Sequence, residues 1–145
     1  MRLRIAVLVA LLVFALPSAG CSVFAGEEAP EEKVAGPGAT VRGDLPEDVP
    51  AKLPLWPGSE VLEGSSSEQA YEVVLSTSDD FDLVLKGLAA GFDDEGWEIV
   101  EEPLGEGEER VTMLSVTNSD SEGFITLTQD ASQTVISYVV TPAQD

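Results

Sequence analysis

The spacing of apolar residues divides the chain into three regions. Residues 5–16 are apolar without interruption, residues 22–50 show neither a helical nor a strand period, and the remainder alternates apolar and polar positions in regular patterns. The third region is long enough for one modest hydrophobic core and too short for two. We therefore expect a single folded domain over residues 51–145.

Six stretches of this domain are predicted to form strands. In residues 71–77 every second side chain is aromatic, aliphatic or threonine, as in a strand with one buried face. The other stretches are residues 60–63, 97–102, 110–117, 124–130 and 134–141. Both faces of the last stretch are apolar, so we expect a central strand, or one whose outer face around Val135 and Val139 meets a partner.

A helix is predicted between the second and third strands. Five apolar residues there recur at spacings of three and four and make one stripe: Phe81, Val84, Leu85, Leu88 and Phe92. Thr77 or Ser78 can cap its start, and Gly96 is placed to end it. Gly87 and Gly91 each weaken the helix by about 1 kcal/mol relative to alanine, and we expect them to allow close contact with the sheet. The fold class is thus α+β, with the order ββαββββ: an antiparallel sheet of about five to six strands with one amphipathic helix packed on one face.

The region before the domain predicts a tether. Residues 21–50 are rich in glutamate, alanine, glycine and proline, so they cannot bury enough apolar surface to offset the entropy of ordering. We expect a disordered acidic linker with a reach of roughly 30 Å. Trp56 follows this linker and precedes a turn at Pro57 and Gly58. Trp56 is expected to anchor the edge of the core, with contact to a ligand or partner as the alternative.

The apolar run near the start has the parts of an export signal. Arg2 and Arg4 precede twelve apolar residues, and Pro17 breaks the helix before a group of small residues. This run is shorter than the roughly 20 residues that a membrane-spanning helix needs. We therefore predict a signal peptide over residues 1–20, removed by cleavage between Gly20 and Cys21.

The residues at the predicted cleavage point are Ser18, Ala19, Gly20 and Cys21, and Cys21 is the single cysteine of the chain. They resemble the lipobox of bacterial lipoproteins, with Ser18 standing where that family usually has leucine. The resemblance implies that Cys21 receives a diacylglycerol and becomes the first residue after cleavage. Ordinary secretion after Gly20 and an uncleaved anchor are the alternatives. The domain also resembles, loosely, the small sheet-and-helix modules that bacterial lipoproteins carry, and this likeness implies no function.

The charge of the chain limits its partners. The sequence has 7 basic and 27 acidic residues, and loss of Arg2 and Arg4 with the signal leaves 5 basic residues against 27 acidic ones, a net charge of −22. Nucleic acid and anionic lipid headgroups would repel such a protein, so membrane attachment would have to come from the lipid. Solubility is the simpler explanation of the acidity, and cation binding is the alternative.

The sequence contains no catalytic pattern. It has no histidine, which removes histidine-based acid–base catalysis and imidazole metal ligands. Cys21 is assigned to lipid, so no thiol nucleophile remains. No nucleotide-binding motif and no nucleophilic-serine motif occurs. We therefore predict that the protein is not an enzyme and uses no cofactor.

One polar stretch matches part of a calcium-binding loop. Asn118, Asp120 and Glu122 place oxygen ligands at positions 1, 3 and 5 of such a loop, and Gly123 stands at position 6. Position 12, normally glutamate, is Gln129, and the flanking residues have the pattern of strands rather than helices. A polar hairpin turn is therefore favoured, with weak Ca²⁺ binding as the hypothesis to test.

Together these patterns predict an exported protein that is attached by lipid to the outer side of the cell membrane, or to an outer membrane where the organism has one. Its domain is expected to interact with another envelope protein. The alternative is a module at the membrane surface that binds a small ligand or a cation. An apolar face around Val135, Val139 and Trp56 would favour a protein partner, and a closed pocket would favour a ligand.

Overall fold

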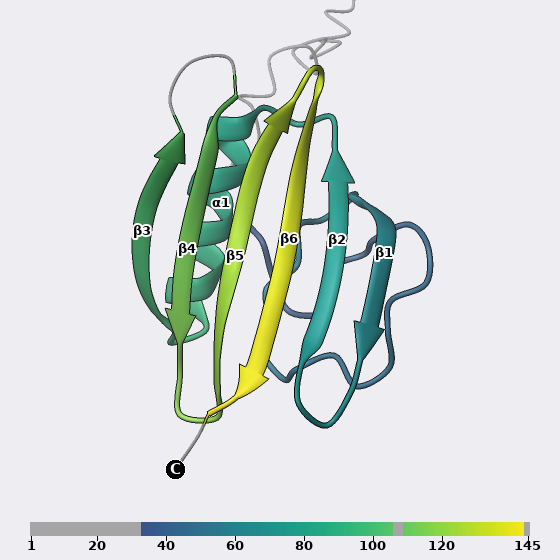
Figure 1. The fold of residues 1–145 in the computed structure, drawn as a ribbon, viewed down its shortest axis with the longest axis vertical. Helices are drawn as coiled ribbons and strands as arrows, with labels where there is room; N and C mark the ends of the chain where they lie inside the picture. The colour runs from purple at the N-terminus through teal and green to yellow at the C-terminus, as the bar shows by residue number, and fades with distance from the viewer. Residues whose placement is uncertain (1–32, 106–108, 144–145) are drawn as a thin grey trace, which may run out of the picture.

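The computed structural model describes residues 33–105 and 109–143 (Figure 1). It contains six strands: β1 (Glu60–Ser66), β2 (Tyr71–Thr77), β3 (Glu98–Gly105), β4 (Val111–Thr117), β5 (Ser121–Asp130) and β6 (Gln133–Pro142). They form one sheet in the order β1-β2-β6-β5-β4-β3, in which every neighbouring pair is antiparallel. Helix α1 (Phe81–Asp94) lies behind the sheet in Figure 1. The predicted α+β fold with the order ββαββββ is confirmed.

Strand β6 lies in the interior of the sheet, as the apolar character of both its faces predicts. It pairs with β2 on one side and with β5 on the other. Ile136 and Tyr138 of β6 lie opposite Leu75 and Val73 of β2, and all four side chains are buried in the core. Because side chains alternate between the two faces of a strand, the intervening residues of β6 lie on the face away from the core.

Helix α1 begins after its predicted caps, Thr77 and Ser78. The carboxylate of Asp80 accepts hydrogen bonds from two backbone N–H groups of the first turn, so Asp80 is the N-cap. Thr77 cannot take this role because it still belongs to β2 and pairs with β6. The other end agrees with the prediction: Gly96 follows the helix with a φ of 80°, a conformation that glycine adopts readily.

Four strands, β1, β3, β5 and β6, are longer than the ranges that the alternation of apolar residues predicts. β1 continues to Ser66, which pairs with Tyr71, although the serine run there reads as a loop. β3 continues through Pro103, which pairs with Thr112. Proline is tolerated at this position because β3 is an edge strand, where one side of the backbone has no partner strand. Pairing to a neighbouring strand thus extends each element beyond its apolar stretch.

The N-terminal segment (residues 33–58) packs against the domain, so the prediction of a disordered tether is wrong for residues 33–50. Ala35 is only 4% exposed and belongs to the hydrophobic core. Backbone hydrogen bonds join Gly36 to Leu55, and Arg42 forms a parallel bridge with Glu60 at the start of β1. Figure 1 shows this segment behind β1, β2 and β6, the half of the sheet that α1 does not cover.

The two glycines of α1 make room for this segment rather than for the sheet, which corrects the expectation for Gly87 and Gly91. A Cβ atom at Gly87 would overlap the carbonyl oxygen of Lys33 and would lie 2.9 Å from Cη2 of Trp56. A Cβ atom at Gly91 would lie 3.0 Å from that of Ala35. The backbone N–H of Ala35 donates to the carbonyl of Gly87 at 3.1 Å. The helix is therefore packed against the sheet on one side and against the N-terminal segment on another.

A single hydrophobic core lies between the sheet and the two elements that cover it. Within this core the rings of Phe92 and Trp97 meet edge to face, with centroids 5.4 Å apart. Trp97 also donates from Nε1 to the carbonyl of Lys52, which ties the N-terminal segment to the start of β3. Within the two described ranges, no helix has the length and apolar character that a membrane crossing requires.

Candidate functional site

The sheet face opposite α1, here called the outer face, is the candidate site. A line of five residues crosses it, one from each of five adjacent strands: Glu72, Val139, Phe124, Ser115 and Val100. We call this line the outer row. Its three large apolar side chains are exposed, Val139 by 36%, Phe124 by 52% and Val100 by 66%. In Figure 1 neither α1 nor the N-terminal segment reaches this side, so the described chain leaves the outer row uncovered.

Acidic residues surround the apolar part of the outer row. Glu72 occupies one end of the row, beside Val139. Glu122 lies two residues before Phe124 on β5, and therefore on the same face. Two further glutamates flank Val100 on β3 at the same two-residue spacing. These four residues, called the rim glutamates, are Glu72, Glu98, Glu102 and Glu122.

No positive charge balances the rim glutamates within the described chain. None of the six strands contains a lysine or an arginine. The described ion pairs join Lys33 to Asp79, Arg42 to Glu60 and Arg110 to Asp82. None of them involves a rim glutamate. The outer face therefore combines exposed apolar side chains with charge of one sign.

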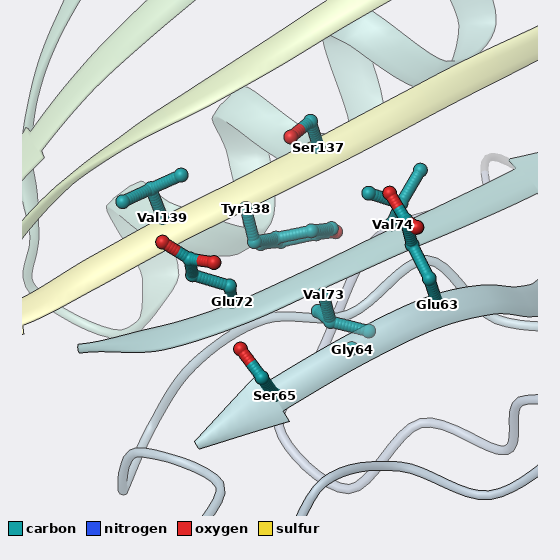
Figure 2. A pocket seen from close by; sticks show the side chains of 9 residues that line it. All are labelled: Glu63, Gly64, Ser65, Glu72, Val73, Val74, Ser137, Tyr138 and Val139. Atoms are coloured by element: carbon teal, nitrogen blue, oxygen red, sulfur yellow. The ribbon is translucent and has the colours of Figure 1, made fainter. Parts of the chain in front are cut away.

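A hollow of about 370 Å³ opens between β1, β2 and β6 (Figure 2). Its lining consists of Glu63, Gly64, Ser65, Glu72, Val73, Val74, Ser137, Tyr138 and Val139. The small side chains of Ser65 and Ser137 leave space between the larger residues. Figure 2 shows Glu63 and Glu72 beside this space, with Tyr138 on the far side of the strands. The hollow thus lies at one end of the outer row and has two carboxylates at its border.

The three residues of the predicted partner face, Val135, Val139 and Trp56, do not lie on one face of the sheet. Val139 belongs to the outer row, and Val135 lies on the same face, half-buried between Ser76 and Thr128. Trp56 is completely buried on the opposite side of the sheet, beside α1, so it cannot contact a partner. The sequence interpretation that placed it in the core is the correct one.

Trp56 takes part in a polar cluster at the start of α1. Its indole Nε1 donates to the carboxylate of Asp79 at 2.8 Å, and Nζ of Lys33 lies 5.2 Å from its ring centroid. Asp79 also accepts hydrogen bonds from Lys33 and from the hydroxyl of Thr77. Partial burial raises the pKa of Asp79, but these hydrogen bonds and the Lys33 charge outweigh it and hold the pKa below its ordinary value. This cluster fastens the N-terminal segment to the domain.

The calcium-loop residues form a turn. The side-chain oxygen of Asn118 accepts hydrogen bonds from the backbone N–H groups of Asp120 and Ser121, at 2.9 and 2.8 Å. Glu122 lies in β5, opposite Thr117 and Thr141. In residues 33–105 and 109–143 no three histidine, cysteine, aspartate or glutamate side chains are grouped so that they could hold a metal ion. The geometry is that of a hairpin closed by an asparagine side chain.

Two tyrosine hydroxyl groups are buried in the domain, and the sequence analysis assigns neither of them a function. Tyr71 and Tyr138 bury their hydroxyls without a hydrogen-bond partner among the described residues. Burial raises the pKa of both phenols. The nearby backbone of Trp56 lowers the pKa of Tyr138 and partly offsets the effect of burial, although the Tyr138 hydroxyl forms no hydrogen bond with it.

The predicted signal peptide (residues 1–20), the cleavage point at Gly20 and the lipid-attachment residue Cys21 lie outside the described residues. Sequence reasoning missed Phe124 and Val100 as members of the outer face. The signal for Phe124 was a large apolar residue on the otherwise polar face of its strand, opposite to the face of Ile125 and Leu127. Comparison of the chain with protein-family models, with curated proteins and with solved structures finds no match.

Proposed function

We propose that this protein is a lipid-anchored extracytoplasmic protein whose domain binds another protein of the cell envelope. The interaction half of this proposal rests on the uncovered outer row, in which Val139 and Phe124 are exposed on neighbouring strands and Val100 is exposed on the far side of Ser115. Exposed apolar side chains in one contiguous area of a small domain mark interaction sites more often than isolated ones do. The anchoring half rests on the lipobox-like residues that end at Cys21.

The anchor is tested by the intact mass of the mature protein, with Cys21→Ala as the control. We expect a mass that matches residues 21–145 plus acyl chains in the membrane fraction, and loss of this processed form in the variant. An unmodified protein that begins at Cys21 and is found in the medium would overturn the anchor. That result would leave the interaction module in place as a secreted binder.

The interaction is tested by site-specific photo-crosslinking in cells that express the full chain. A photoreactive residue at Phe124 reports on the outer row, and the same residue at Asp93, exposed on α1, is the matched control. We expect a discrete crosslinked product from position 124 and a weaker or absent one from position 93. Equal products from both positions would contradict a binding role for the outer face.

Binding of a small ligand or a cation is the second candidate, and the hollow of about 370 Å³ is the observation that favours it. Its volume falls within the range of ligand sites. A small ligand seated there would touch Ser65 and Ser137. If Ca²⁺ or a metabolite binds in the hollow, it should raise the melting temperature of the protein, and Ser137→Phe should abolish this increase. That result would support ligand binding over binding of a protein partner.

A further inference from the structure

We infer that the partner of the outer row is a protein surface on which lysine or arginine side chains surround an apolar patch. This inference rests on the proposed interaction function and names the chemistry of the partner. The four rim glutamates stand around Val139, Phe124 and Val100 and have no ionic partner within the described chain. A partner of opposite charge supplies the missing counter-charges and covers the apolar side chains in one contact.

The same charges argue against the other occupants of this face. A second copy of the chain would bring glutamates against glutamates, since the six strands carry no basic residue. An anionic membrane surface would be repelled for the same reason. The net charge of −20 strengthens both effects at long range. A basic protein surface is the occupant that the electrostatics favour.

The hollow beside Glu72 gives the contact a specific feature. Ser65 and Ser137 leave space between β1 and β6, and the carboxylates of Glu63 and Glu72 border it (Figure 2). A lysine or arginine side chain fits this arrangement because its hydrocarbon stem packs on Val74 and Val139 while its charged end reaches a carboxylate. We therefore place one basic side chain of the partner in the hollow and its apolar patch over Phe124.

The test uses the full chain with the photoreactive residue at position 124 and compares two charge variants. The first is Glu72→Lys with Glu122→Lys, which reverses two rim glutamates. The second is Asp93→Lys with Asp94→Lys, which changes the net charge by the same amount on α1. Reversed charges place like against like in the contact, so we expect the first variant to reduce the crosslinked product at least about tenfold. The second variant should stay within about twofold of the unmodified chain, because long-range charge alone is screened at physiological salt.

Three further measurements test whether the partner surface is basic, separately from whether the outer face binds a protein at all. The neutral variant Glu72→Gln with Glu122→Gln should give an intermediate loss, and its far-ultraviolet circular dichroism should match that of the unmodified chain. The product should also decrease when membranes are treated with 0.5 M salt before irradiation. Mass spectrometry of the product should place the crosslink in a partner segment with lysine or arginine beside apolar residues.

The results that would overturn the basic partner differ from the result that would overturn the interaction function. A product that persists in the first variant and in high salt would overturn the basic partner while leaving an interaction at the outer face. Equal losses in both lysine variants would overturn it as well, since net charge rather than the rim would then control binding. A crosslink to a second copy of the chain would have the same effect. Absence of any product from position 124 above that from position 93 would overturn the interaction function itself.

Discussion

Replacement of Gly87 by alanine should destabilise this protein, although alanine is the better helix former. Gly87 lies in the interior of α1, where glycine ordinarily lowers helix stability by about 1 kcal/mol. A Cβ atom at this position would overlap the carbonyl oxygen of Lys33 and would lie 2.9 Å from Cη2 of Trp56. Both neighbours are held in place, one as backbone and one as a completely buried ring. The substitution therefore has to displace the N-terminal segment.

The magnitude follows from three contributions. Overpacking a well-packed core costs about 1–3 kcal/mol. The hydrogen bond from Ala35 to the carbonyl of Gly87, 3.1 Å long, contributes about 1 kcal/mol that is lost when the segment shifts. The improved helix propensity returns about 1 kcal/mol. The net loss is thus about 1–3 kcal/mol, which lowers the melting temperature by roughly 5–15 °C for a domain of this size.

Two measurements check this result in the full chain with Cys21→Ala. Urea unfolding gives the free energy, and limited trypsin digestion reports on Lys33 and Arg42, which should be cut faster once the segment shifts. Ala89→Gly is the control, expected to destabilise by about 1 kcal/mol through helix propensity without faster cutting at these sites. If Gly87→Ala instead stabilised the protein by about 1 kcal/mol, the packing of the N-terminal segment on α1 would be refuted.

Three other substitutions test separate features. Asp79→Asn should lower the free energy of unfolding by about 1 kcal/mol at pH 7. Because folding lowers the pKa of Asp79, its contribution to stability is present above pH about 4 and is lost as the pH falls through the folded pKa. In urea unfolding, the difference between the variant and the unmodified protein should therefore shrink steadily as the pH is lowered below about 4. Tyr138→Phe removes a buried hydroxyl that lacks a partner and should leave the melting temperature unchanged or raised, whereas a loss above about 1 kcal/mol would reveal a hydrogen bond. Phe124→Thr should change stability by less than about 0.5 kcal/mol while abolishing the crosslink from a photoreactive residue at Val139, and a large loss of stability would place Phe124 in the folding core instead.

The sheet and the helix were predictable because their signals are periodic along the chain. Alternation in β2, and an apolar stripe in α1, follow directly from which side each residue faces. The two apolar faces of β6 likewise predicted its interior position. The helix cap was missed because pairing with β6 keeps Thr77 in β2, which moves the N-cap to Asp80. That pairing depends on residues distant in sequence, and no local pattern contains it.

The N-terminal segment was not predictable for a related reason. It has too few large apolar residues to build a core of its own, which is the usual mark of disorder. It is ordered because it adds to a surface that the domain already provides, with Ala35 against Gly91 and Trp56 against Gly87. The outer row was predictable only at Val139, since its composition depends on which strands are neighbours. The strand order β1-β2-β6-β5-β4-β3 had to be known before Phe124 and Val100 could be joined to it.

Packing of the N-terminal segment also limits the distance between the proposed lipid attachment and the outer row. On the proposed attachment at Cys21, only residues 22–32 separate the lipid from Lys33, and a chain of that length spans at most about 40 Å. Lys33 is held by Asp79, whose carbonyl accepts a hydrogen bond from Thr134 near the start of β6. The outer row crosses β6 five residues further along, at Val139, or about 17 Å away. On the proposed function, a binding partner would have to present its basic surface within about 60 Å of the lipid, and the packing of the N-terminal segment would limit which envelope proteins the domain can reach.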